Sequence, residues 1–299
     1  MFFKGESREI VRNYPAAERG SGRRIWELDF LRGFTILLMW IDHFMYDLAF
    51  EFSRTWIKQG GAAAAVAKFA KMWWDHGASW VGQTRDIIQI IALCIFFGLC
   101  GGSTIFSKDN ATRAMKTMLA AAVITLGTYL AATLDIISDG DVITFGVLQM
   151  LSFATLIVSA VYALTRLAKK RGDLLFVILS VLLAGGCFLA DYLITQANPE
   201  KSQWFLFLHE SFAKSAWVGG DYFPLIPYLG YAFGGAAVIT LLYGGGKSLF
   251  PKGDGAWNRP FRFVGRHTLL IVIVHQVVNM LLLALLTAAF VDTGNFVIF

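Results

Sequence analysis

Four ionisable residues lie on one face of an apolar segment near the N-terminus: Asp29, Arg32, His43 and Asp47. At about 100° per residue of an α-helix they fall within roughly 60° of one another, whereas Asp42 points to a different face. Asp47 follows His43 by one helical turn, so its carboxylate can reach the imidazole, orient it and raise its basicity. A histidine held in this way can accept a proton from a reacting group. The spacing therefore predicts a general base on a helix.

Ionisable side chains inside a membrane span are costly, by roughly 2.5–3.5 kcal/mol each on insertion scales. A cost of that size favours a functional role for His43 and Asp47. The alternative is a buried polar group that a neighbouring helix satisfies by hydrogen bonding.

The other histidines occupy different settings. His275 lies in the middle of the last apolar segment, beside Gln276 and one turn before Asn279. His267 begins the same segment, where a histidine is more often interfacial than catalytic. By composition alone the remaining two are loop histidines, His76 and His209.

The composition indicates a membrane protein. The chain has 299 residues, of which 56% are hydrophobic and 16% charged, with a mean hydropathy of +0.57. Soluble proteins contain roughly 45–50% apolar and about 25% charged residues. These values exclude a disordered chain, a coiled coil, a collagen and a disulfide-stapled secreted module. No disulfide framework is expected, because all three cysteines lie inside apolar blocks: Cys94, Cys100 and Cys187.

Seven segments are apolar enough to be read as spanning helices, since a span needs about 20 residues and a helix satisfies its own backbone in lipid. We therefore predict an all-α integral membrane protein, a polytopic bundle in which a cytosolic segment, 1–28, precedes one transmembrane domain, 29–299. The expected spans are roughly 33–50, 86–106, 114–134, 142–164, 174–195, 222–243 and 267–290.

Positively charged residues set the predicted orientation. With a cytosolic N-terminus, 19 of the 26 Lys and Arg residues lie in inner segments, as the positive-inside rule requires. The C-terminus then lies outside. The basic inner segments could attract an anion, although the positive-inside bias alone also explains their charge.

Three irregularities are predicted. Pro224 and Pro227 near the start of the sixth span predict a broken or re-entrant first turn, and glycines 244–246 end that span. Residues 61–74 are too short and too interrupted to span, so we expect them at the interface or capping the bundle. Close helix packing is the expected role of three glycines in the second span, Gly98, Gly101 and Gly102.

Four ordered segments are familiar. The first is ELDFLRG at 27–33, followed by Met39 and by HFMYDL at 43–48; the others are FGVLQ at 145–149, DYFPLIPYLG at 221–230, and GRHTLL at 265–270 with HQ at 275–276. In this order they cover most of the chain. Their combination resembles the heparan-alpha-glucosaminide N-acetyltransferase catalytic-domain family of the transmembrane acyltransferase superfamily. The chain looks like a short member of bacterial type.

The resemblance implies transfer of an acetyl group from cytosolic acetyl-CoA to an acceptor reached from the other side of the membrane. In the lysosomal relative the catalytic histidine stands just before the second span, and the segment 76–80 looks like that region with one residue inserted. His76 is thus a catalytic candidate by similarity. His43 occupies a first-helix position that is polar across the family and a histidine in many bacterial members. The choice between the two stays open.

We therefore expect a membrane-embedded acyltransferase whose acceptor is an amine or hydroxyl of sugar or glycan type. His43, oriented by Asp47, or His76 deprotonates the acceptor or carries the acetyl group itself. His275 and Asn279 are expected to donate to the thioester oxygen. Coenzyme A is expected near residues of the cytosolic end, namely Asp29, Arg32, Arg113, Arg262, Arg266 and His267.

A proton-coupled small-molecule transporter is the alternative, because intramembrane Asp and His residues also relay protons. It would require discontinuous helices and an internal repeat, and the sequence has one Pro-interrupted span and no repeat. The expected partners are the acceptor and the lipid bilayer of the plasma (inner) membrane, with a homodimer left open. Neither a metal nor a nucleic acid is expected.

Overall fold

The computed structural model describes residues 25–107, 109–135, 137–168, 171–214, 217–219 and 221–290. Residues 1–24, which make up most of the expected cytosolic segment, lie outside the described residues. So do residues 291–299, and with them the expected position of the C-terminus.

The described chain is helical. Its α-helices are α3 (Trp26–Asp47), α4 (Ser53–Gln59), α5 (Gly61–Trp73), α6 (Trp80–Gly102), α7 (Asn110–Thr133), α8 (Val147–Arg166), α9 (Gly172–Ala197), α10 (Leu225–Tyr243), α11 (Arg259–Arg266) and α12 (Thr268–Phe290). A π-helical segment, Leu48–Phe52, joins α3 to α4. Short 3-10 turns occupy Ser103–Ile105, Asp139–Asp141, Glu210–Phe212, Pro251–Gly253 and Ala256–Asn258.

Within the described ranges, six helices are long and apolar enough to cross a membrane: α6 with its 3-10 extension, α7, α8, α9, α10 and α12. They correspond to the second through seventh predicted spans. The first predicted span lies within α3 and the π-helical segment. α3 is not among the six, because its 22 residues include five charged side chains, Glu27, Asp29, Arg32, Asp42 and Asp47. The first predicted span, which would bring the count to seven, and the orientation of the chain remain predictions.

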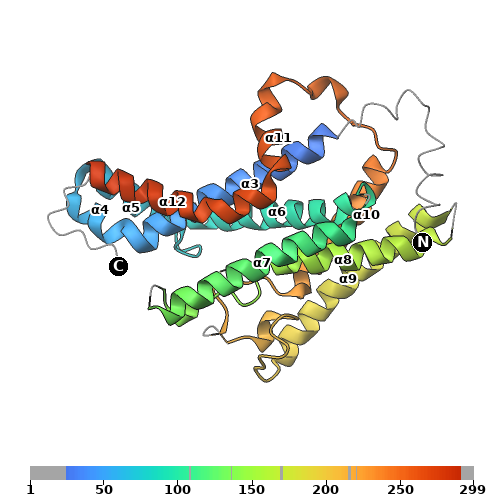
Figure 1. Cartoon of the computed structure of the whole chain (residues 1–299), viewed down its shortest axis with the longest axis horizontal. Helices are drawn as coiled ribbons and strands as arrows, with labels where there is room; N and C mark the ends of the chain where they lie inside the picture. The colour runs from blue at the N-terminus through green and yellow to red at the C-terminus, as the bar shows by residue number, and fades with distance from the viewer. Residues whose placement is uncertain are drawn as a thin grey trace.

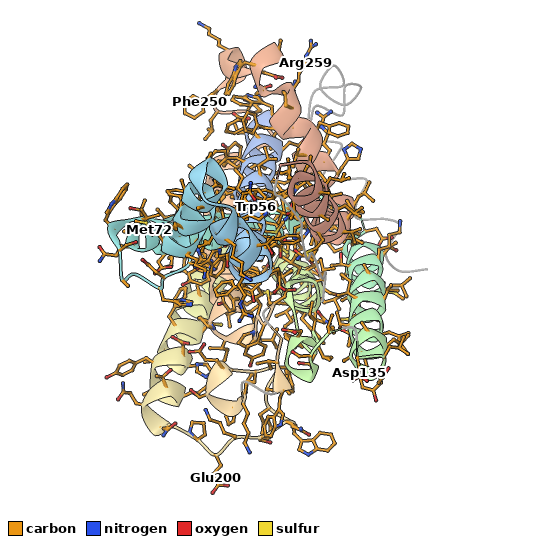
Figure 2. All side chains as sticks on the ribbon, turned by 90° about the vertical axis from the view of Figure 1, so that its left-hand side faces the viewer. Trp56, Met72, Asp135, Glu200, Phe250 and Arg259 are labelled. Carbon is orange, nitrogen blue, oxygen red and sulfur yellow. The ribbon has the colours of Figure 1, made fainter. Side chains whose placement is uncertain are left out.

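The helices give the molecule two ends. The first, which we call the basic end, holds the start of α3, α11 and the segment 244–258. The second, the loop end, holds α4, α5 and the segments 134–146 and 198–224. Figure 1 shows α4 and α5 together at one extremity and α11 beside the start of α3. In Figure 2, Phe250 and Arg259 lie far from Asp135 and Glu200.

Small residues bring α6 and α10 into close contact, as predicted. Gly98 of α6 faces Gly235 of α10 so closely that a Cβ added at Gly235 would lie 2.0 Å from the Cα of Gly98. A Cβ at Gly101 would lie 2.0 Å from the carbonyl oxygen of Ala232. The backbones therefore approach along a stripe that has no room for side chains.

The irregularities of α10 are also confirmed. Ile226 has non-helical dihedral angles (φ −104°, ψ 127°) within the first turn of the helix, and Gly244 follows its last residue, Tyr243. Segment 61–74 forms α5, which packs on the π-helical segment and α4 through Ala67 and Ala70. α5 is 13 residues long, too short to span a bilayer.

The long segment 198–224 is fastened to α9 by a buried histidine. His209 is 0% exposed, and its Nε2 lies 3.0 Å from the Asp191 carboxylate, while its Nδ1 accepts the Ser211 N–H at 3.0 Å. Because both ring nitrogens are engaged, His209 holds the loop in place and has no nitrogen left for a ligand. Its burial was not expected from the sequence, where it reads as a simple loop histidine.

Candidate active site

A partly buried polar cluster lies between α3 and α12, the first and last described long helices, which run side by side in Figure 1. We call it the α3–α12 polar cluster. It contains the rings of His43 and His275, whose centroids are 4.9 Å apart in a T-shaped arrangement. Its six members are Trp40, His43, Asp47, His275, Gln276 and Asn279. The two helices thus bring together residues more than 230 positions apart in the sequence.

Backbone carbonyls fix the tautomers of both histidines. The Nδ1 of His43 lies 2.9 Å from the Met39 carbonyl oxygen, and that of His275 lies 2.8 Å from the Val272 carbonyl oxygen. A carbonyl oxygen can only accept, so each Nδ1 carries a proton in the neutral ring and each Nε2 presents a lone pair. Both rings are therefore prepared to accept a proton at Nε2.

This tautomer changes the role expected of His275. A neutral ring with its proton on Nδ1 cannot donate from Nε2 to a thioester oxygen. The Nε2 of His275 is buried and has no hydrogen-bond partner among the described residues. A lone pair in that position suits a base better than an oxyanion donor.

Asn279 retains the donor role. Its Oδ1 accepts the indole N–H of Trp40 at 2.6 Å, which fixes the orientation of the amide. The Nδ2 of Asn279, on a side chain that is 0% exposed, makes no hydrogen bond of ordinary length within the described structure, but it interacts with the nearby carboxylate of Asp47. An oriented amide donor in a buried site is the kind of group that stabilises a developing oxyanion.

Asp47 has a different partner from the one expected. Its Oδ1 accepts the Gln276 side-chain N–H at 2.7 Å, and its Oδ2 has no partner among the described groups. His43, in turn, donates to its own helix through Met39. His43 and Asp47 are one turn of α3 apart, as predicted. However, the Gln276 side-chain amide of α12 donates to the carboxylate oxygen that was expected to orient the His43 imidazole.

The helix changes its winding directly after Asp47. Residues 48–52 form the π-helical segment, and π-bulges are frequent at functional sites because they re-aim the adjoining side chains. Asp47 is 1% exposed, so this buried carboxylate stands at the boundary between the two kinds of helix. The sequence carries no signal that predicts this change.

At the basic end, the Asp29 carboxylate pairs with two of the arginines that were expected to bind coenzyme A. Its carboxylate accepts the Nε–H of Arg266 at 3.1 Å and lies 3.5 Å from the Nη1 of Arg32. Two glycines make the contact possible, because a Cβ at Gly265 would lie 1.9 Å from the Asp29 carbonyl oxygen and one at Gly33 would lie 1.8 Å from a carbonyl oxygen of α11. Asp29 therefore holds cations in place and is not itself a ligand for an anion.

Arg262 and His267 accompany Arg266 along α11. An open pocket of about 380 Å³ is lined by Arg259, Arg262, Phe263, Arg266 and His267. Arg262 is paired with Asp254 at 2.8 Å, and His267 donates from Nδ1 to the Phe263 carbonyl oxygen. The pocket is positively charged, and charge of this sign suits phosphate groups.

Arg113 lies at the start of α7. Its Nη1 donates to the hydroxyl of Ser103 at 3.1 Å, and its Nη2 is buried without a partner within the described chain. A buried guanidinium with an unused donor is suited to an anion.

The predicted family segments meet one another in space. The N–H of Val147 donates to the carboxylate of Asp221 at 3.2 Å, and the N–H of Phe223 donates to the Phe145 carbonyl oxygen. Burial raises the pKa of Asp221, and the Val147 N–H and the charge of His43 partly oppose that rise. Asp221 thus connects the loop end to the neighbourhood of His43. It was part of a sequence motif but was not selected as a site residue.

His76 lies apart from the cluster, in the loop between α5 and α6. The ring is exposed and makes an edge contact with Trp74, with centroids 6.3 Å apart. The indole N–H of Trp74 donates to the carbonyl oxygen of Asp42, the residue before His43. The two candidate histidines therefore belong to neighbouring parts of the loop end, and their roles remain predictions.

Among the described residues, no group of three or more His, Cys, Asp and Glu side chains could hold a metal ion.

Comparison with known proteins agrees with this arrangement. Residues 24–73 and 67–277 match the family described as "Heparan-alpha-glucosaminide N-acetyltransferase, catalytic". No curated protein matches the chain, and no solved structure does. The matched stretch includes all four contacting segments, the whole of α3 and the part of α12 up to residue 277, so Asn279 lies beyond it. The chain therefore belongs to the heparan-alpha-glucosaminide N-acetyltransferase catalytic-domain family, a family of membrane transferases.

Proposed function

We propose that the protein transfers an acetyl group from cytosolic acetyl-CoA to an amine or hydroxyl of a sugar or glycan acceptor that reaches the site from the loop end. The α3–α12 polar cluster is the observation that carries this proposal. It offers two imidazole lone pairs, one on the half-buried His43 and one on the buried His275, and the buried amide donor of Asn279. These are a base and an oxyanion donor, the two groups that acyl transfer requires.

The direction of the two helices suits the donor substrate, acetyl-CoA. The phosphates of acetyl-CoA lie at the basic end, near Arg32, Arg266 and the pocket along α11, with Arg113 close by. α3 and α12 both run from that end toward the cluster, and His43 lies 14 residues beyond Asp29, roughly 21 Å along the helix axis. The thioester of an extended acetyl-CoA then approaches His43 and His275.

The chemical step follows from the tautomers. The Nε2 lone pair of a histidine removes the proton from the acceptor amine or hydroxyl as its heteroatom bonds to the acetyl carbon. Asn279 donates to the carbonyl oxygen as negative charge develops on it. The C–S bond then breaks, and the histidine returns the proton to the CoA thiolate.

Purified protein in detergent tests the proposal. Acetyl-CoA should raise the unfolding temperature, and the protein should release CoA when glucosamine is supplied as a probe acceptor. Asn279→Ala should lower kcat by roughly 10²–10³-fold, the cost of losing one oxyanion donor, and leave the KM for acetyl-CoA nearly unchanged. The kcat values of His43→Gln, His275→Gln and His76→Gln then show which of the three histidines acts as the base: its variant should lose the most activity.

Solute flux into proteoliposomes without consumption of acetyl-CoA would support the transporter instead. A protein whose unfolding temperature does not respond to CoA or acetyl-CoA, and which consumes neither with any probe acceptor, would contradict the proposal.

A further inference from the structure

A second polar group, separate from the α3–α12 polar cluster, lies on another face of α3. Its centre is Arg85 of α6, whose side chain is 4% exposed. Arg85 donates from Nε and Nη2 to the two carboxylate oxygens of Asp42, at 2.9 and 2.7 Å. This is the two-pronged geometry in which a guanidinium binds a carboxylate most firmly.

The remaining donors of Arg85 are used within α6. Its Nη1 donates to Asp86 at 3.1 Å and to the side-chain oxygen of Gln89 at 2.8 Å. Every guanidinium nitrogen therefore has a partner, which is the condition under which a buried charge is tolerated. An ion pair so completely satisfied can hold two helices in one register.

The same pair holds the loop that carries His76. The guanidinium of Arg85 lies 3.6 Å from the ring centroid of Trp74, in cation–π contact. The indole N–H of Trp73 donates to the Asp42 carboxylate at 2.8 Å, and that of Trp74 donates to the Asp42 carbonyl oxygen at 3.2 Å. Asp42 is thus the common partner of α6 and of the two tryptophans that end α5.

From Trp74 the chain turns sharply to His76. His76 and Gly77 both have left-handed dihedral angles, with φ of 52° and 80°. For His76, a residue with a Cβ, such an angle is uncommon and requires support from its surroundings. The ring of Trp74 is in edge contact with His76 on one side and with Tyr46 of α3 on the other.

We propose that Arg85 and Asp42 form a latch that fixes the loop of residues 73–79 on α3 and thereby sets the position of His76 relative to His43. The two residues are positioning residues, because neither needs to touch a substrate. Asp42 is next to His43 in the chain but faces α6, so one residue pair connects both candidate histidines. The catalytic part of this inference rests on the proposed acetyl transfer, whereas the latch itself does not.

Spin labelling measures the latch without any substrate. Ala78 is exposed, so a nitroxide can be attached through Ala78→Cys in a background where Cys94, Cys100 and Cys187 are replaced by alanine. Arg85→Gln and Asp42→Asn should each sharpen the nitroxide spectrum, because the loop gains motion. Arg85→Lys keeps the charge but loses the two-pronged fork, so it should give an intermediate spectrum.

Kinetics then test the positioning role in the same variants. With glucosamine as the probe acceptor, Arg85→Gln should lower kcat by roughly 10²-fold, the scale that a misplacement of about 1 Å can produce. The KM for acetyl-CoA should change by less than about twofold. Arg85→Lys should recover part of the kcat, which a general loss of folding would not allow.

Arg166→Gln is the matched control. Arg166 pairs with Asp173 at 2.8 Å between α8 and α9, at the basic end and away from the loop. Its loss should leave both the spectrum at position 78 and kcat unchanged. If Arg85→Gln does not accumulate because the half-buried Asp42 carboxylate has lost its cation, the double variant Arg85→Gln with Asp42→Asn removes both charges and takes its place.

A spectrum that stays as immobile in Arg85→Gln as in the parent would overturn the latch. A mobile loop with an unchanged kcat would overturn its positioning role. If the parent protein consumes no acetyl-CoA, the proposed function fails, but the spectra still decide whether Arg85 and Asp42 hold the loop.

Discussion

Two adjacent residues of α3, Asp42 and His43, contact different neighbouring helices. Asp42 faces Arg85 of α6, whereas the ring of His43 faces His275 of α12. A rotation of about 100° per residue separates the two directions. The sequence arithmetic that assigned Asp42 to another face is therefore confirmed, and the residue it set aside anchors a separate group of contacts.

Asp221 yields a prediction at this scale. Burial raises the pKa of this loop carboxyl, so the folded state binds its proton more tightly than the unfolded chain does. The stability that this group contributes is complete below its unfolded pKa of about 3.9 and is lost as the pH rises through its folded pKa. Asp221→Asn removes the titration, and its amide oxygen can still accept the Val147 N–H.

We therefore expect the unfolding temperature of the wild type to fall relative to that of Asp221→Asn as the pH increases from about 4 to about 8. Thermal unfolding of both proteins in detergent, across that range, measures the difference. A difference that does not depend on pH would show that Asp221 does not titrate differently in the folded protein.

At the scale of elements, the contact between α6 and α10 depends on glycine. Gly101→Val should be strongly destabilising, since its Cβ would meet the Ala232 carbonyl oxygen at 2.0 Å and overpacking of this kind costs about 1–3 kcal/mol or more. Thermal unfolding measures the loss. Gly185→Ala on α9 is the control, because no atom lies within 4 Å of its added Cβ. Equal stability of both variants with the parent would contradict the packing described here.

The sequence predicted the helices better than it predicted the side-chain contacts between them. Hydropathy located the long helices to within about seven residues at each end, the prolines predicted the broken turn at Ile226, and the glycines predicted the approach of α6 to α10. The partner predicted for the Asp47 carboxylate, His43, was wrong. Helical periodicity places residues on one face of a helix, but it does not say which neighbouring helix supplies the hydrogen-bond partner. The partner, Gln276, lies 229 positions away. The π-helical segment and the Arg85–Asp42 pair were missed for the same reason, since both depend on tertiary packing.

At the scale of the whole molecule, the positively charged residues expected to bind coenzyme A and the loops that an acceptor would pass lie at different ends. The candidate phosphate-binding residues Arg32, Arg262 and Arg266 lie at the basic end, and the loops through which an acceptor would approach lie at the loop end. The positive-inside rule then predicts a cytosolic basic end. This places the expected donor and acceptor on opposite sides of the membrane.

Labelling in intact cells tests that orientation. Glu200 and Lys252 are exposed at the two ends. Glu200→Cys should react with a membrane-impermeant maleimide in intact cells, and Lys252→Cys should react only after permeabilisation. The opposite pattern would invert the assignment of donor and acceptor sides.

The pairing of α3 with α12 also has a consequence for biogenesis. α3 carries too many charges to enter lipid readily by itself, and α12, the helix that shelters its polar face, is synthesised about 220 residues later. During translation the cluster must remain incomplete until α12 arrives. A nascent chain truncated before α12 would lack His275, Gln276 and Asn279, and so the reactive chemistry assembles only after α12 has been synthesised.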